Sequence, residues 1–151
     1  MDANSFPDLN TDHDKPFSQE GYTLVGAAFE VHRTVGGGLL EDVYQECLEC
    51  ELRLRAIPFV ARQELAVYYK GKELRKRYIP DLYVSDGIVV ELKAVACIAP
   101  EHEAQLLNYM RIARKPVGYL LNFAPLEGAQ WKRMVLSDFN SRARPRTSSN
   151  Y

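Results

Sequence analysis

The chain of 151 residues is long enough for one domain with a substantial core, and 46% hydrophobic and 26% charged residues are typical of a soluble globular protein. No apolar run approaches the ~20 residues that a membrane-spanning helix needs, and the N-terminus has no signal-peptide pattern. We therefore expect a cytoplasmic protein with no membrane contact. The three cysteines, an odd number, argue against a disulfide framework.

The formal net charge of −1 conceals an uneven distribution of charged side chains. Residues 1–20 are acidic, whereas basic side chains cluster in residues 70–77 and again between residues 132 and 146. The first cluster contains Lys70, Lys72, Arg75, Lys76 and Arg77. Clustered cations can bind phosphates without reading base sequence, and they can equally form an ordinary solvated surface. The charge pattern therefore leaves nucleic-acid binding open.

The elements can be predicted in chain order. After a flexible acidic tail at residues 1–19, helical spacing of apolar residues predicts a helix over residues 21–35, which Gly36-Gly37-Gly38 ends. A second helix is predicted over residues 41–55. Turn residues then separate short strands at residues 59–63, 65–69, 73–79, 81–84 and 88–95.

Pro100 predicts the start of a third helix that runs to about residue 114, because proline is favoured at the first helical position. A strand at residues 117–123 and a short edge strand at residues 132–136 follow. This order predicts one α+β domain over residues 20–137, with a central sheet flanked by helices. Residues 138–151 are basic and are expected to be disordered.

Charged side chains interrupt two otherwise apolar strands in residues 79–93, at Asp81, Glu91 and Lys93. Burying a charge costs several kcal/mol unless the charge is paired or binds a metal ion. Because successive strand residues point to opposite faces, Glu91 and Lys93 share one face. This pattern favours a metal-dependent site over an ordinary ion pair on a solvated face.

The turn between the two strands decides where Asp81 lies. A two-residue loop at Asp86-Gly87 would place Asp81 on the wrong face. A three-residue loop at residues 85–87, with Gly87 in the left-handed conformation, pairs Val84 with Ile88 and sets Asp81 opposite Glu91. Side chains paired in this way have Cβ atoms roughly 5 Å apart, close enough to share a divalent cation. We favour the three-residue loop.

Three motifs point to a known family. Residues 38–44 read G-x-x-E-x-x-Y, residues 80–81 read P-D, and residues 91–93 read E-x-K. The chain closely resembles the GxxExxY proteins, a family of the PD-(D/E)XK nuclease superfamily, over about residues 20–136. The resemblance implies a restriction-endonuclease-like αβββαβ core, built as an α/β/α sandwich around a mixed sheet. It also implies phosphodiester hydrolysis, with DNA as the expected substrate and Mg²⁺ (or Mn²⁺) as cofactor.

The resemblance also implies roles for individual residues. Asp81 and Glu91 would be the principal metal ligands, with the Leu92 carbonyl and Glu41 (directly or through water) completing the protein's share. Lys93 would orient or help to deprotonate the attacking water, or neutralise charge in the transition state. Glu41 could instead have a purely structural role, because acidic residues also stabilise the first turn of a helix.

Other residues are candidates for substrate contacts. Gln105 and Tyr109 match a Q-x-x-x-Y pattern of related exonucleases, in which Gln105 would position the nucleophile or the phosphate and Tyr109 would contact nucleotide. His102 lies three residues before Gln105, so both can face the site from one helix, although a structural role for His102 is the simpler reading. The basic cluster contributes Lys72, Arg75, Lys76 and Arg77 as candidate phosphate contacts.

Two other functional classes stay open at this point. A catalytically inactive nucleic-acid-binding module could keep the same fold and the same residues, and a protein-interaction domain would fit the modest net charge. A homodimer is an option for a small nuclease with one site, because two copies can cut both strands of a duplex.

Overall fold

The computed structural model describes residues 15–137, so most of both predicted tails lies outside the described residues. Within them the chain forms helices α1 (Ser18–Val35), α2 (Glu41–Leu54) and α3 (Pro100–Ala113). The strands are β1 (Phe59–Ala61), β2 (Leu65–Tyr69), β3 (Lys72–Tyr78), β4 (Leu82–Val84), β5 (Ile88–Lys93), β6 (Val117–Asn122) and β7 (Gln130–Val135). Each predicted element is present, with its ends displaced by a few residues at most. Among these residues, none of the helices has the length and apolar character needed to cross a membrane.

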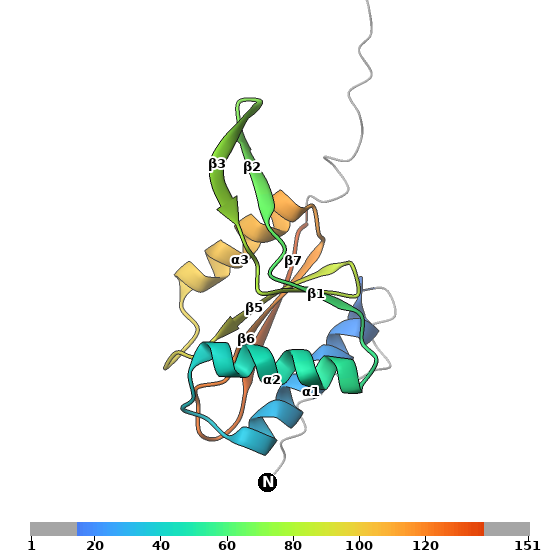
Figure 1. Cartoon of the computed structure of the whole chain (residues 1–151), viewed down its shortest axis with the longest axis vertical. Helices are drawn as coiled ribbons and strands as arrows, with labels where there is room; N and C mark the ends of the chain where they lie inside the picture. Colours follow the sequence, from blue (N-terminus) through green and yellow to red (C-terminus); the bar gives the residue numbers. More distant parts are fainter. Residues whose placement is uncertain (1–14, 138–151) are drawn as a thin grey trace, which may run out of the picture.

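Five strands form the central sheet in the order β1-β4-β5-β6-β7. Strands β5 and β6 are parallel and the other neighbours are antiparallel, so the sheet is mixed. Helices α1 and α2 lie together on one side of the sheet and α3 lies on the other (Figure 1). This arrangement confirms the predicted α+β class and is consistent with a restriction-endonuclease-like fold.

The two-residue alternation of β5 divides the core between these layers. Val90 and Leu92 pack in the cluster that contains the buried residues of α1 and α2. Val89 packs instead with Leu106 and Met110 of α3. Glu91 and Lys93 follow Val89 on the face that α3 covers, so these charged residues approach that helix rather than the larger core.

Helix α3 lies close to the sheet because Gly118 of β6 has no side chain. A Cβ atom at Gly118 would lie 2.5 Å from the Met110 Sδ and 2.9 Å from a Leu106 methyl carbon. These contacts are far shorter than van der Waals separation, so any larger residue would require the Met110 and Leu106 side chains of α3 to move. The close approach brings the side chains of α3 within reach of Glu91 and Lys93.

The register of the β4–β5 hairpin agrees with the three-residue loop. Val84 pairs with Ile88 and Leu82 pairs with Val90. The predicted conformation of Gly87 is wrong, because the positive φ angles belong to Ser85 (51°) and Asp86 (58°).

Packing against the start of the chain explains why glycine occupies position 87. A Cβ atom at Gly87 would lie 1.9 Å from the Phe17 ring. Phe17 packs against the main core, and α1 begins at Ser18, three residues earlier than predicted. The Pro16 carbonyl also accepts a hydrogen bond of 2.7 Å from Arg133. The folded domain therefore includes the last residues of the segment predicted to be a tail.

Strands β2 and β3 do not join the central sheet. They form a separate two-stranded antiparallel sheet that projects from the body next to α3 (Figure 1). Its pairing is irregular between Ala66 and Tyr68. We call residues 65–78 the hairpin arm.

Candidate active site

Asp81 and Glu91 are held together by two hydrogen bonds that cross between their strands. The backbone N–H of Asp81 donates to the Glu91 Oε1 over 2.9 Å, and the backbone N–H of Leu92 donates to the Asp81 Oδ2 over 2.8 Å. Glu91 is only 5% exposed. Each carboxylate thus uses one oxygen to bind the neighbouring backbone, which fixes the orientation of the other oxygen.

Lys93 and α3 form the second part of the site. The Lys93 Nζ donates to the Gln105 Oε1 over 3.0 Å, and the Gln105 Nε2 donates to the Tyr109 hydroxyl over 3.2 Å. Gln105 and Tyr109 are four residues apart, so they lie on one face of the helix. The Tyr109 ring contacts Tyr78 at the end of β3, with 5.3 Å between the ring centroids. A continuous series of polar side chains therefore joins the end of β5 to the base of the hairpin arm.

Glu41, the first residue of α2, reaches the site from the opposite layer. Burial, and then the charge of Asp81, raise the pKa of Glu41, whereas Lys93 and a hydrogen bond from the Ala94 backbone lower that pKa. These influences show that the Glu41 carboxylate lies near both strands of the site.

Tyr44 organises the segment that leads into Glu41. Its hydroxyl donates to the Gly36 carbonyl over 2.7 Å and accepts a hydrogen bond from the Leu39 N–H over 3.1 Å. Its buried ring stacks on Phe123 with 4.7 Å between centroids. Gly38, with a φ of 86°, supplies a left-handed conformation that other residues rarely adopt. The G-x-x-E-x-x-Y motif is thus a turn whose glycine and tyrosine fix the start of α2.

We expect Tyr44→Phe to destabilise the domain by about 0.5–1.5 kcal/mol, because it removes two part-buried hydrogen bonds that hold the turn before α2. Tyr83→Phe is the matched control, since the buried Tyr83 hydroxyl has no hydrogen-bond partner among the described residues. Thermal unfolding should show a lower Tm for the Tyr44 variant only. Equal Tm values for the two variants would contradict the role of the Tyr44 hydroxyl.

The carboxylates of the half-buried Asp81 and the buried Glu91 repel one another. Burial, and then the charge of Asp81, raise the pKa of Glu91 to about 8. Burial also raises the pKa of Asp81, although the hydrogen bond from the Leu92 N–H opposes this change. Raised carboxylate pKa values of this kind are typical of functional sites, where like charges lie close together in a poorly solvated environment. A bound cation would relieve the repulsion between the two carboxylates.

Sequence reasoning missed the residue that holds Asp81 from α2. The buried side chain of Gln45 donates to the Asp81 carbonyl over 3.1 Å, and the Arg62 N–H donates to the same carbonyl over 3.2 Å. Gln45 lies four residues after Glu41, so helical spacing could have shown that both face the site. No sequence signal indicated the contact of Tyr78 with Tyr109, because it joins elements far apart in the chain.

The remaining predicted residues lie outside this group. His102 uses its Nδ1 to accept a hydrogen bond of 2.9 Å from the Ala99 N–H, which stabilises the first turn of α3. The four basic candidates all lie on the hairpin arm and are exposed: Lys72, Arg75, Lys76 and Arg77. They do not join the carboxylates, so any contact with substrate would be made at a distance from the reacting bond.

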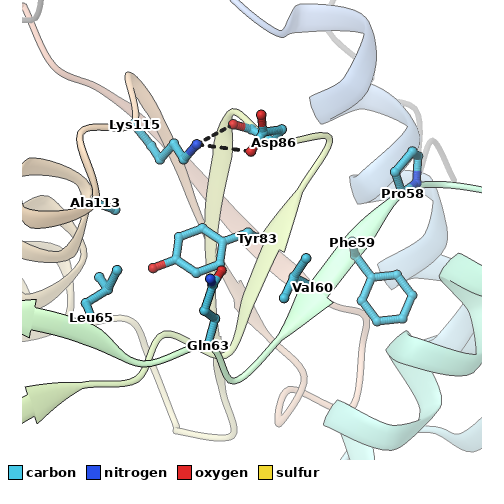
Figure 2. A pocket seen from close by; sticks show the side chains of 9 residues that line it. All are labelled: Pro58, Phe59, Val60, Gln63, Leu65, Tyr83, Asp86, Ala113 and Lys115. Carbon is cyan, nitrogen blue, oxygen red and sulfur yellow. Dashed lines mark hydrogen bonds and ion pairs between the residues drawn. The ribbon is translucent and has the colours of Figure 1, made fainter.

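A cavity of about 380 Å³ lies beside the site, on the face of β4 that points towards α3 (Figure 2). Tyr83 lies across it, and apolar side chains including Val60 and Leu65 line it. Lys115 donates to the Asp86 carbonyl over 2.7 Å at its rim. Burial, and then the charge of Glu91, raise the pKa of Tyr83 to about 12, so its hydroxyl stays protonated at neutral pH.

The donor set of the site suits a cation that keeps several of its own water ligands. Within residues 15–137, no three Asp, Glu, His or Cys side chains are arranged to hold a metal ion, so Glu41 does not complete a three-carboxylate group. A hard cation such as Mg²⁺ needs only one or two carboxylates, because it retains several waters. The Leu92 carbonyl points to the same side of β5 as its N–H, towards Asp81. Two carboxylates and one carbonyl therefore fit such an ion.

The family model of the PD-(D/E)XK nuclease superfamily matches residues 18–134. The chain belongs to this superfamily. Nucleases of this superfamily typically use divalent metal ions. The narrower assignment of this PD-(D/E)XK protein to the GxxExxY proteins stays a prediction.

The crystal structure of SSO0001 has a similar fold, with a TM-score of 0.51 and 19% sequence identity. The match covers 62% of this chain and 48% of that protein, so the chain spans about half of its length. At this identity the likeness concerns the fold alone. The comparison with curated proteins found no match.

Proposed function

We propose that this PD-(D/E)XK protein is a nuclease that hydrolyses phosphodiester bonds, with DNA as the substrate and Mg²⁺ or Mn²⁺ as the cofactor. The observation that carries the proposal is the crossed pair of Asp81 and Glu91 beside Lys93. Glu91 is buried, Asp81 is half-buried, and both have raised pKa values. Crowding two carboxylates in this way destabilises the fold, and metal-dependent nuclease activity would account for it.

Asp81, Glu91 and the Leu92 carbonyl would hold the divalent cation, which when bound lowers the pKa of water and polarises a phosphoryl oxygen. Lys93 would orient the attacking water or stabilise the negative charge that develops on the phosphate. Its bond to Gln105 fixes the ammonium group beside the carboxylates, and Tyr109 in turn fixes Gln105. An ammonium group and carboxylates that are already in position need little reorganisation when the transition state forms.

Cleavage assays on the purified full chain test this proposal. Single-stranded and duplex DNA, RNA of the same sequence and a circular plasmid would be incubated with Mg²⁺, Mn²⁺ or a chelator. We expect cation-dependent cleavage by the wild type, which Asp81→Asn abolishes. Glu46→Gln, which removes an exposed carboxylate of α2, should cleave like the wild type. Cleavage of the plasmid would distinguish endonuclease from exonuclease action.

Two outcomes would contradict the proposal. Equal cleavage by the wild type and Asp81→Asn would show that the assigned site does not perform the reaction. Salt-sensitive binding to nucleic acid without cleavage under any cation would favour an inactive binding module with this fold. For duplex substrates, the proposal includes a homodimer, which light scattering would detect.

A further inference from the structure

The hairpin arm is exposed although it belongs to the folded domain. Its two strands pair only with each other, and it extends away from the central sheet (Figure 1). An isolated two-stranded hairpin is only marginally stable in water, so an arm of this kind gains little from its own core. Binding of a partner would stabilise such an exposed ribbon.

The positive charge of the arm indicates that such a partner is negatively charged. Residues 65–78 contain five lysines and arginines and one acidic residue, Glu73. Arg77 pairs with Glu73 over 2.8 Å, which leaves Lys70, Lys72, Arg75 and Lys76 without an ion-pair partner among the described residues. Four uncompensated cations on a narrow ribbon favour a polyanion. They also oppose pairing of two arms from two copies, since like charges would meet.

Two tyrosines near the tip indicate more than phosphate binding. Tyr68 and Tyr69 are each 63% exposed. Because they are adjacent in a strand, their rings point to opposite faces of the ribbon. Lys70 lies over the Tyr69 ring, with 5.5 Å from its Nζ to the ring centroid. Exposed aromatic rings interleaved with cations are the features that bind single-stranded nucleic acid, where unpaired bases offer free faces for stacking. Bases inside a duplex are stacked on their neighbours and offer no free faces to tyrosine rings.

The base of the arm is continuous with the candidate active site. Tyr78, the last residue of β3, contacts Tyr109, which receives the hydrogen bond from Gln105. Pro80 and Asp81 follow two and three residues after Tyr78. A strand of the length of β3 extends roughly 23 Å at about 3.3 Å per residue, so the arm reaches well beyond the site.

We propose that the hairpin arm binds a single-stranded segment of the nucleic-acid substrate and leads it to the site, with Tyr68 and Tyr69 stacking on unpaired bases and Lys72 and Lys76 contacting phosphates. The inference rests on the proposed function for the reaction itself. It specifies the substrate class as single-stranded DNA, or a duplex that carries a single-stranded end.

Binding is measured separately from cleavage in the full-length Glu91→Gln variant. Fluorescence anisotropy would compare a labelled single strand with a blunt duplex of the same sequence. We expect tighter binding to the single strand, and a loss of at least about 10-fold on replacing both Tyr68 and Tyr69 with serine, given the usual stacking contribution of tyrosine. Lys72→Gln with Lys76→Gln should reduce the slope of log affinity against log salt by about 1.4, the value for two phosphate contacts on a single strand.

Arg33→Gln with Arg53→Gln is the matched control, because these exposed arginines lie on α1 and α2, in the layer opposite α3. Its affinity and salt slope should equal those of the parent. Unchanged single-strand binding in the Tyr68/Tyr69 variant, with its Tm preserved, would overturn the inference, as would equal losses for single strand and duplex. A dimer that becomes monomeric in that variant without loss of binding would identify the arm as a self-association surface instead.

Failure of the proposed function would look different. If the wild type binds single strands through the arm but cleaves no substrate, the nuclease proposal fails and the role of the arm stands. If the wild type cleaves through Asp81 but the arm variants bind and cleave normally, the nuclease proposal stands and the proposed role of the arm fails.

Discussion

Replacing Glu91 with glutamine is expected to lower phosphodiester cleavage by at least about 100-fold while the domain stays folded, because it removes charge that the transition state requires. The amide oxygen of glutamine can still accept the hydrogen bond from the Asp81 N–H that the Glu91 Oε1 accepts over 2.9 Å. The variant therefore preserves the contact between β4 and β5 and removes a negative charge. Initial cleavage rates at saturating Mg²⁺, together with the circular dichroism spectrum, measure both parts of the prediction.

Glu46→Gln makes the same chemical change on the exposed surface of α2 and should leave the rate unaltered. If Glu91→Gln keeps more than about a tenth of the wild-type rate, Glu91 does not supply the electrostatic stabilisation we assign to it. Recovery of cleavage at high Mn²⁺ concentration would instead indicate weakened cation binding, which agrees with its assigned role as a ligand.

Stability without metal is expected to fall as the pH rises from about 5.5 to about 9, and more so in the wild type than in Glu91→Gln. Burial and the charge of Asp81 raise the pKa of Glu91 from 4.5 to about 8 in the folded protein. The folded state therefore binds this proton more tightly than the unfolded state does. Its stabilising contribution is complete below pH 4.5 and is lost as the pH rises through about 8. The raised pKa of Asp81 acts in the same direction.

Thermal unfolding in the presence of a chelator measures this effect. The fall in Tm between the two pH values should be larger in the wild type than in Glu91→Gln by at least about 3 °C, which corresponds to about 1 kcal/mol for a domain of this size. Excess Mg²⁺ should raise the wild-type Tm more at the higher pH, because the cation binds the deprotonated carboxylates. Identical pH profiles for the two proteins would show that the Glu91 pKa is not raised by folding.

The features of the site that depend on neighbouring residues could be predicted from the sequence. Strand alternation placed Glu91 and Lys93 on one face, and the length of the turn gave the pairing of Val84 with Ile88. The family resemblance, rather than spacing alone, paired Gln105 with Tyr109, and their four-residue separation on α3 allows the hydrogen bond between them. In each case the periodicity of one element or the length of one loop decides the geometry.

The features that could not be predicted depend on packing between segments that are far apart in the sequence. The Phe17 ring occupies the space that a Cβ at Gly87 would need, so glycine is required there for packing, and the positive φ angles of the loop belong to Ser85 and Asp86 instead. Gln45 holds the Asp81 carbonyl only because α2 crosses the sheet at that point. Such contacts depend on the relative placement of elements, which local patterns do not encode.

The sequence by itself determined the order of the elements, the α+β class, and the face on which the charged strand residues lie, because these follow from hydrophobic period and turn length. The tertiary structure brings Glu41, which only the family resemblance had placed at the site, towards Asp81 from the opposite layer, and it separates β2 and β3 from the central sheet. The physical reason is that both depend on which surfaces pack against each other. Buried area between distant segments, rather than the preference of any one segment, settles that choice.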